Sequence, residues 1–180
     1  MQTPTTTAAP GVGRIVLVAA ALVGAFAIDR ATKIWALDSL SDGSVIPFAP
    51  GFSLELHFNP GVAFGIGADV GAPLVVGLML IISVLCVWIA LRLIRRSSLP
   101  GTVFLAVVAG GALGNLWDRI SRAQNGPLTG EVIDFLAVEW FSIFNVADIF
   151  TTCGFIAWAM TSSPMSGIRA TPAAPDRNTR

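Results

Sequence analysis

Four long apolar runs constrain this chain more than any other feature of its sequence. They cover residues 15–37, 72–91, 100–117 and 140–160. A membrane-spanning helix needs about 20 apolar residues, and the chain is 54% hydrophobic but only 12% charged, whereas soluble domains are about 25% charged. We therefore expect an all-α membrane protein of one domain with four transmembrane helices. The net charge of zero excludes nucleic acid as a partner.

Both ends of the chain differ from these runs in composition. Residues 1–13 and 162–180 contain mainly small, polar and proline residues, which cannot bury enough apolar surface to fold. We expect two disordered cytoplasmic tails around a four-span domain over residues 14–161.

The first apolar run also resembles a secretory signal peptide. Arg14 precedes it, and Ala25-Phe26-Ala27 is similar to the small-residue site at which signal peptides are cleaved. The run continues past Asp29-Arg30 to Leu37, however, and carries an interfacial tryptophan at its outer end. This continuation favours a spanning helix.

Residues 38–65 have a different pattern. Prolines and a glycine break helical structure, and residues 52–58 alternate between apolar and polar or small side chains, which predicts a short strand. A turn follows in which Asn59 can donate and accept hydrogen bonds and Gly61 permits close backbone approach. We expect a small β-like cradle on the extracytoplasmic surface of the membrane.

Two aspartates at the entrance of the last apolar run, Asp134 and Asp148, are the first candidates for a functional site. A charge in hydrocarbon costs about 2.5 to 3.5 kcal/mol on insertion scales, so intramembrane acids indicate function. Polar residues three or four apart share one helical face on either side of them: Asn115, Asp118 and Arg119, and then Asn145 and Asp148. The polar groups of two helices are thus expected to converge.

Asp29 and Lys33 are four residues apart, acid before base, and are expected to pair. Their spacing is compatible with a role in a site and equally with an interfacial anchor whose charged end reaches toward water. A Ser/Lys peptidase would use Lys33 as its base, but a neighbouring carboxylate favours the charged lysine and opposes that role.

Histidine and cysteine offer little other chemistry. His57 is the only histidine, so a Ser/His/Asp triad or a histidine zinc site would depend on it alone, and a surface histidine on a strand is the better interpretation. Cys86 and Cys153 lie within apolar runs and are expected to be buried reduced thiols.

The basic residues predict the direction of the spans. With the N-terminus inside, seven of eleven fall on the cytoplasmic side: Arg14, Arg92, Arg95, Arg96, Arg169, Arg177 and Arg180. The remaining four are Arg30, Lys33, Arg119 and Arg122. This distribution agrees with the positive-inside rule. Since only Asp176 among the acids falls inside, the site is expected to face outward.

A pair of aspartates supports two kinds of function. Carboxyl groups a few ångströms apart cannot both ionise without cost and share a proton. The ionised member can deprotonate a water molecule while the protonated member polarises a carbonyl, which is peptide hydrolysis without a metal or other cofactor. The same pair could relay protons in a transporter, although the spans contain no inverted repeat. A small assembly factor also stays open.

Five ordered blocks then carry a family resemblance. They are Asp29-Arg-Ala-Thr-Lys33, Asn59-Pro-Gly61-Val-Ala-Phe64-Gly, Gly110-Gly-Ala-Leu-Gly-Asn115-Leu-Trp-Asp118-Arg119, Val132-Ile-Asp134-Phe135 and Phe144-Asn145-Val-Ala-Asp148. Together they resemble the lipoprotein signal peptidases, or signal peptidase II, over roughly residues 15–160. One block alone would be weak, but five in order are highly specific.

The resemblance implies a four-span aspartic endopeptidase of the bacterial inner (cytoplasmic) membrane, with cytoplasmic termini and an active site toward the extracytoplasmic face. It would remove the signal peptide from diacylglyceryl-modified prolipoproteins, cutting before the lipidated cysteine, at the level of membrane lipid. Globomycin-type peptides would block its pocket. Asp134 and Asp148 match the catalytic dyad.

Other residues match positions that line the substrate pocket or support it: Asp29, Lys33, Asn59, Gly61, Asn115, Asp118, Arg119 and Asn145. The chain departs from the family in the loop over residues 121–130, which is longer than in the shortest members, and in Glu131, where histidine is frequent. These departures leave the loop contacts in doubt, but not the dyad.

Overall fold

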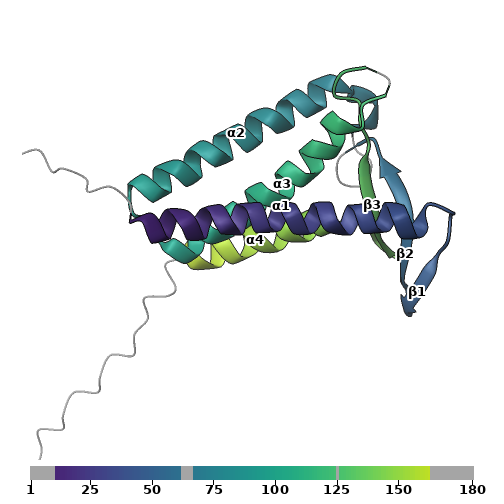
Figure 1. The fold of residues 1–180 in the computed structure, drawn as a ribbon, viewed down its shortest axis with the longest axis horizontal. Coiled ribbons are helices and arrows are strands. Elements are labelled where there is room, and N and C mark those ends of the chain that lie inside the picture. Colours follow the sequence, from purple (N-terminus) through teal and green to yellow (C-terminus); the bar gives the residue numbers. More distant parts are fainter. Residues whose placement is uncertain (1–10, 62–66, 125, 163–180) are drawn as a thin grey trace, which may run out of the picture.

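Two β-hairpins interrupt the series of helices along the chain, one after α1 and one before α4. The computed structural model describes residues 11–61, 67–124 and 126–162. Its elements are α1 (Val12–Leu40), β1 (Ile46–Ala49), β2 (Phe52–Asn59), the short 3₁₀ helix η2 (Ala68–Val70), α2 (Ala72–Ile94), α3 (Leu99–Ser121), β3 (Val132–Val138), β4 (Ser142–Phe144) and α4 (Val146–Ser162). Helices α1, α2, α3 and α4 run in alternating directions, and the sheet lies at the end of the bundle where α1 and α3 finish (Figure 1).

Within the described residues, three helices, α1, α2 and α3, are long and apolar enough to cross a membrane. The shortest of them have 23 residues, or about 35 Å of helix, against about 30 Å of hydrocarbon. Helix α4 is apolar but has only 17 residues. The expected mostly helical architecture is thus confirmed for three spanning-length helices, joined by a small antiparallel sheet.

Helix α3 packs closely against α1 and α4 through glycines. A Cβ at Gly110 would overlap the backbone of Leu22 on α1, and one at Gly111 would lie 2.7 Å from the carbonyl oxygen of Ala147 on α4. Small residues allow such approach between apolar helices. Away from the sheet, one buried apolar cluster joins α1, α2 and α3: Val18, Ile89, Leu105, Ala106 and Ala109.

The sheet has four antiparallel strands in the order β1-β2-β3-β4. Strand β3 is central and almost entirely buried. Its Ile133 and Phe135 pack against Ala36 and Leu40 near the end of α1. This contact fixes the sheet to the helical bundle and determines where the side chains of β3 can point.

The sheet is larger than the sequence predicted. Strands β1 and β2 confirm the cradle expected between residues 38 and 65. The fourth helix was expected to begin near Trp140, which is wrong: residues 132–144 form β3 and β4, and α4 begins at Val146. A nearly continuous apolar run fits a buried strand as well as a helix, so periodicity alone cannot separate them.

The structure also bears on the predictions made for the tails, the histidine and the cysteines. The predicted tails fall largely on residues 1–10 and 163–180, outside the described residues, while helix α1 already begins at Val12. His57 is exposed on β2, as expected. The two cysteines are free thiols, but Cys86 is only partly buried and Cys153 is exposed, so the expectation of burial is wrong.

The contact between α3 and α4 leads to a stability prediction. Gly111→Ala should lower the free energy of unfolding by about 1 to 3 kcal/mol, because the added methyl group meets backbone that cannot move aside without separating the helices. Thermal unfolding in detergent measures the loss. The control is Gly77→Ala on α2, where an added Cβ meets nothing within 4 Å and helix propensity improves. Equal melting temperatures for the two variants would contradict this packing.

Candidate active site

The N-terminus of α4 carries a reciprocal pair of caps. Asn145 immediately precedes the helix, and its side-chain oxygen accepts the backbone N–H of Asp148 at 3.1 Å. In return, Oδ2 of Asp148 accepts the backbone N–H of Asn145 at 3.1 Å. This is the capping-box arrangement. The spacing of Asn145 and Asp148 therefore reflects a helix cap, not a shared helical face as expected.

A residue far away in sequence caps the same helix end. The backbone N–H of Ala147 donates to Oδ1 of Asp29 on α1 at 3.1 Å. The positive end of the α4 dipole thus faces the carboxylates of Asp29 and Asp148. The entrance of α4 is held by α1 as well as by its own first turn.

Asp134 comes from the middle of β3 and is only 2% exposed. Its Oδ1 accepts a hydrogen bond from Asn145 Nδ2 at 2.6 Å. Its Oδ2 accepts one from Asn59 Nδ2 on β2 at 3.0 Å. The amide of Asn59 is turned this way because its own oxygen accepts the backbone N–H of Gly61 at 2.9 Å.

Asn115 on α3 links the two aspartates. Its Nδ2 donates to Oδ1 of Asp148 at 2.9 Å. Its Oδ1 accepts from Asn145 Nδ2 at 3.1 Å and from Lys33 Nζ at 2.6 Å. The two carboxyl groups therefore belong to one amide network that runs from Asp134 through Asn145 and Asn115 to Asp148.

A buried ionic cluster lies behind this network. Lys33 pairs with Asp29 and with Asp118, each at 2.9 Å, and all three side chains are fully buried. Arg30 pairs with the other oxygen of Asp118 at 2.5 Å. A buried charge is tolerated when it is paired, and here two cations face two carboxylates. The predicted pair of Asp29 and Lys33 is confirmed, but in the protein interior and not as a surface anchor.

The hydrogen bonds of Arg119 go to backbone carbonyl oxygens and not to a carboxylate. Its guanidinium donates to the carbonyl oxygen of Pro60 at 3.0 Å and also to that of Gly61. A longer contact of 3.4 Å reaches the carbonyl oxygen of Gly130. Arg119 thereby fixes the segments that flank β2 and β3 beside Asn59 and Asp134.

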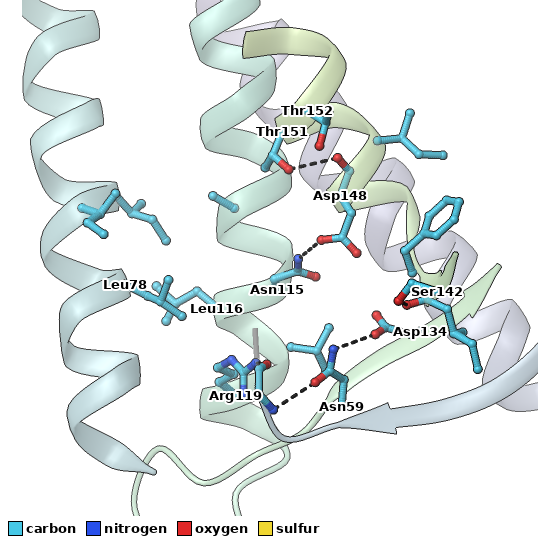
Figure 2. Close-up of a pocket in the computed structure, with 18 of the residues that line it drawn as sticks. Asn59, Leu78, Asn115, Leu116, Arg119, Asp134, Ser142, Asp148, Thr151 and Thr152 are labelled. Carbon is cyan, nitrogen blue, oxygen red and sulfur yellow. Dashed lines mark hydrogen bonds between the residues drawn. The ribbon is translucent and has the colours of Figure 1, made fainter. Parts of the chain in front are cut away.

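The two aspartates open into a cavity of about 610 Å³ between α2, α3, α4 and the sheet. Figure 2 shows their carboxyl groups facing one another, Asp134 from the strand and Asp148 from the first turn of α4. The walls carry polar groups near the aspartates, including Asn59, Asn115 and Arg119. The rest is mostly apolar and includes Leu78, Ile81, Ile82, Leu116 and Ile149.

Burial raises the pKa of Asp134 from its ordinary 3.8 to about 6. The negative charge of Asp148 adds to this increase, while hydrogen bonds from Asn59 and Asn145 and the positive charge of Lys33 reduce it. The pair thus contains one carboxyl group that holds its proton closer to neutral pH than an ordinary aspartate does.

The structure brings most of the predicted site residues to the cavity wall: Asn59, Gly61, Asn115, Arg119, Asp134 and Asp148. It places Asp29, Lys33, Asp118 and Asn145 differently, fully buried behind the wall. Sequence reasoning missed Thr151 and Thr152, which line the cavity on α4. Their positions three and four residues after Asp148, on the same helical face, were the available signal.

Comparison with known proteins identifies the family. A family model described as signal peptidase (SPase) II matches residues 21–163. The lipoprotein signal peptidase of Bifidobacterium adolescentis is 41% identical over 149 residues, which cover 80% of this chain and 74% of that protein. That of Mycobacterium avium is 36% identical over 143 residues, covering 75% and 71%. The chain belongs to the signal peptidase II family.

Two solved structures agree with the fold of this signal peptidase II family member. Both are described as bacterial membrane enzymes. One has a TM-score of 0.67 at 24% identity and covers 94% of this chain and 99% of the solved chain. The other has a TM-score of 0.64 at 26% identity, covering 87% and 96%. Since signal peptidase II is an aspartic peptidase, the peptidase interpretation of the sequence is confirmed over the transporter.

The raised pKa of Asp134 predicts how stability depends on pH. Between about pH 4 and 6 the folded protein binds a proton at Asp134 that the unfolded chain has lost, so stability falls as the pH rises. Above pH 6, Asp134→Asn should therefore be more stable than the natural protein, by up to about 3 kcal/mol, and the difference should vanish below pH 4. Thermal unfolding in detergent from pH 4 to 8 measures it.

Asp42→Asn is the matched control for this measurement. Asp42 is exposed, and hydrogen bonds from Ser44 lower its pKa. Its replacement should give no gain in stability as the pH rises. A gain for Asp134→Asn that did not change with pH would rule out burial of the carboxyl group as its cause.

Proposed function

We propose that this chain is an intramembrane endopeptidase in which Asp134 and Asp148 form the catalytic dyad. Membership in the signal peptidase II family gives the reaction, removal of the signal peptide from prolipoproteins. The observation that carries the assignment of residues is the meeting of two carboxyl groups, from β3 and from α4, in one cavity. The remaining residues then divide into those that touch substrate and those that hold the dyad.

Asp148 is suited to be the base. Its carboxylate accepts hydrogen bonds from the Asn115 side chain and from the backbone N–H of Asn145. It also lies in the first turn of α4, where the helix dipole favours negative charge. These contacts stabilise the ionised form, which can take a proton from a water molecule placed between the two carboxyl groups.

Asp134 is suited to be the acid, because its raised pKa of about 6 favours the protonated form. It would transfer its proton to the carbonyl oxygen of the peptide bond while water adds to the carbonyl carbon, which gives a gem-diol. The proton taken by Asp148 then passes to the leaving nitrogen as the C–N bond breaks. Asp134 recovers a proton from one hydroxyl of the gem-diol, and the other hydroxyl stays on the new carboxyl group, which ionises in water.

The substrate is a prolipoprotein modified with diacylglycerol and cut before the lipidated cysteine. Support comes from the apolar walls of the cavity on α2 and α4, which include Leu78, Ile82 and Ile149. Such walls suit acyl chains and apolar peptide that arrive from the bilayer. Asn59 and Arg119 lie at the polar end and suit contacts to peptide carbonyl groups. We expect globomycin-type peptides to occupy the same cavity.

The protein crosses the bacterial inner membrane four times within residues 14–161, with both terminal tails in the cytoplasm. Helix α4, of 17 residues, is about 26 Å long and would complete its span with the sheet in the outer interface. Arg14, Arg92, Arg95 and Arg96 lie at the helix ends away from the sheet, and Arg14 donates to the carbonyl oxygen of Ser97 there. By the positive-inside rule that end is cytoplasmic, so the dyad faces outward.

The dyad leads to a prediction for activity. Asp134→Asn and Asp148→Asn should each reduce single-turnover cleavage of a lipidated precursor by at least about 10⁴-fold, and the double variant should be hardly worse, because residues that act as a unit are not additive. Asp42→Asn is the control for loss of an aspartate. Protein yield and melting temperature are checked in parallel. If Asp134→Asn or Asp148→Asn cut the precursor nearly as fast as Asp42→Asn, the assignment of the two aspartates as the catalytic dyad would be wrong.

The membrane-level cavity leads to a prediction for substrate choice. A precursor without diacylglycerol should be cut at least about 100-fold more slowly than the lipidated one, since each buried methylene of the acyl chains adds about 0.8 kcal/mol of affinity for the membrane. Initial rates on the two precursors, with identical peptide sequences and the same detergent, provide the measurement. Equal rates would show that the lipid is not recognised.

A further inference from the structure

Lys33 is fully buried on α1, and its ammonium group has three partners among the described residues, all of them oxygens. They are Oδ1 of Asn115 at 2.6 Å, Oδ2 of Asp29 at 2.9 Å and Oδ2 of Asp118 at 2.9 Å. An ammonium group has three donors and no acceptor. Each partner must therefore turn an oxygen toward it, and Lys33 fixes which way the amide of Asn115 points.

The direction of this amide determines what Asn115 presents to Asp148. With its oxygen held by Lys33, its nitrogen donates to Oδ1 of Asp148 at 2.9 Å. A reversed amide would place its oxygen against a carboxylate oxygen. It would also remove the acceptor for Asn145 Nδ2, now 3.1 Å away. The reversed amide would thus oppose the charged form of Asp148 that a base requires.

We propose that Lys33 is a positioning residue, which acts through Asn115 to keep Asp148 charged and oriented and does not touch the substrate. The proposal rests on the proposed function of Asp148 as the base. Lys33 is 0% exposed and is not part of the cavity wall, unlike Asn115 and Asp148. The family resemblance had matched Lys33 to a position that lines the substrate pocket or supports it, and its burial favours the supporting role.

Arg30 provides a matched control within the same cluster. It also neutralises Asp118, with Nη1 2.5 Å from Oδ1, but approaches from the surface side and is 22% exposed. It supplies the same positive charge to the cluster, while its hydrogen bond goes to Asp118 and not to Asn115. Removing Arg30 therefore tests the effect of losing a positive charge from the cluster. Removing Lys33 tests the loss of the same charge together with the loss of the hydrogen bond that sets the direction of the Asn115 amide.

The variants must keep the buried cluster neutral. Lys33→Met by itself would leave Asp29 and Asp118 with a single cation, and an uncompensated buried charge strongly destabilises a protein. The comparison is therefore between Lys33→Met/Asp29→Asn, which leaves Asp118 paired with Arg30, and Arg30→Met/Asp118→Asn, which leaves Asp29 paired with Lys33. Each double variant removes one cation together with one acid partner, and Asp29→Asn keeps a side-chain oxygen that can accept the N–H of Ala147.

The experiment measures kcat and KM of the full chain in lipid-containing detergent on a diacylglyceryl-modified precursor, per mole of folded protein. The Lys33 double variant should have a kcat about 10- to 100-fold below that of the Arg30 double variant, because a hydrogen bond to a charged group is lost. Its KM should stay within about 2-fold, since an interaction that serves only the transition state is removed.

Equal kcat values for the two double variants, or a loss that appears only in KM, would overturn the proposal. Should the Met variant not fold, Lys33→Gln/Asp29→Asn replaces it: an amide can donate or accept, so it no longer enforces the direction of Asn115, and the same loss in kcat is expected. Failure of the natural protein to cut the precursor would instead contradict the proposed function.

Discussion

The entrance of α4 is the constraint on which the rest of the structure depends. Asn145 and Asp148 cap each other, and Asp29 of α1 caps the N–H of Ala147 between them. Each cap contributes about 1 kcal/mol to helix stability, but their greater effect is geometric. They hold the Asp148 carboxylate at one place and one angle, so helix stability and the proposed chemistry depend on the same hydrogen bonds.

The buried cations make this arrangement possible among apolar helices. Lys33 and Arg30 balance Asp29 and Asp118, and without that balance the cluster would cost several kcal/mol. The close approach of α1 to α3 requires Gly114, because any Cβ there would overlap the carboxylate of Asp29. The glycine-rich segment of α3 is therefore as much a part of the site as its polar residues, although it contributes no chemistry of its own.

Helices and sheet supply different members of the dyad. Asp148 is held by caps that favour its charge, whereas Asp134 lies in a buried strand whose surroundings favour the neutral form. Two identical side chains thus acquire different roles from their environments. Strand β3 can do this because Ile133 and Phe135 pack on α1 and leave the side chain between them to face the cavity.

The sequence by itself determined the apolar helices α1, α2 and α3, the cradle at β2 and the polar residues that gather at the site. The polar residues could be recognised because a charge in hydrocarbon is costly, so a charged residue within an apolar run indicates function. Only the tertiary structure decided that residues 132–138 and 142–144 are strands, that Asn145 is a cap and that Lys33 lies behind the cavity wall. An apolar run satisfies strand and helix alike, and the partners that decide between them come from distant segments, as with Asp29 and Ala147, 118 residues apart.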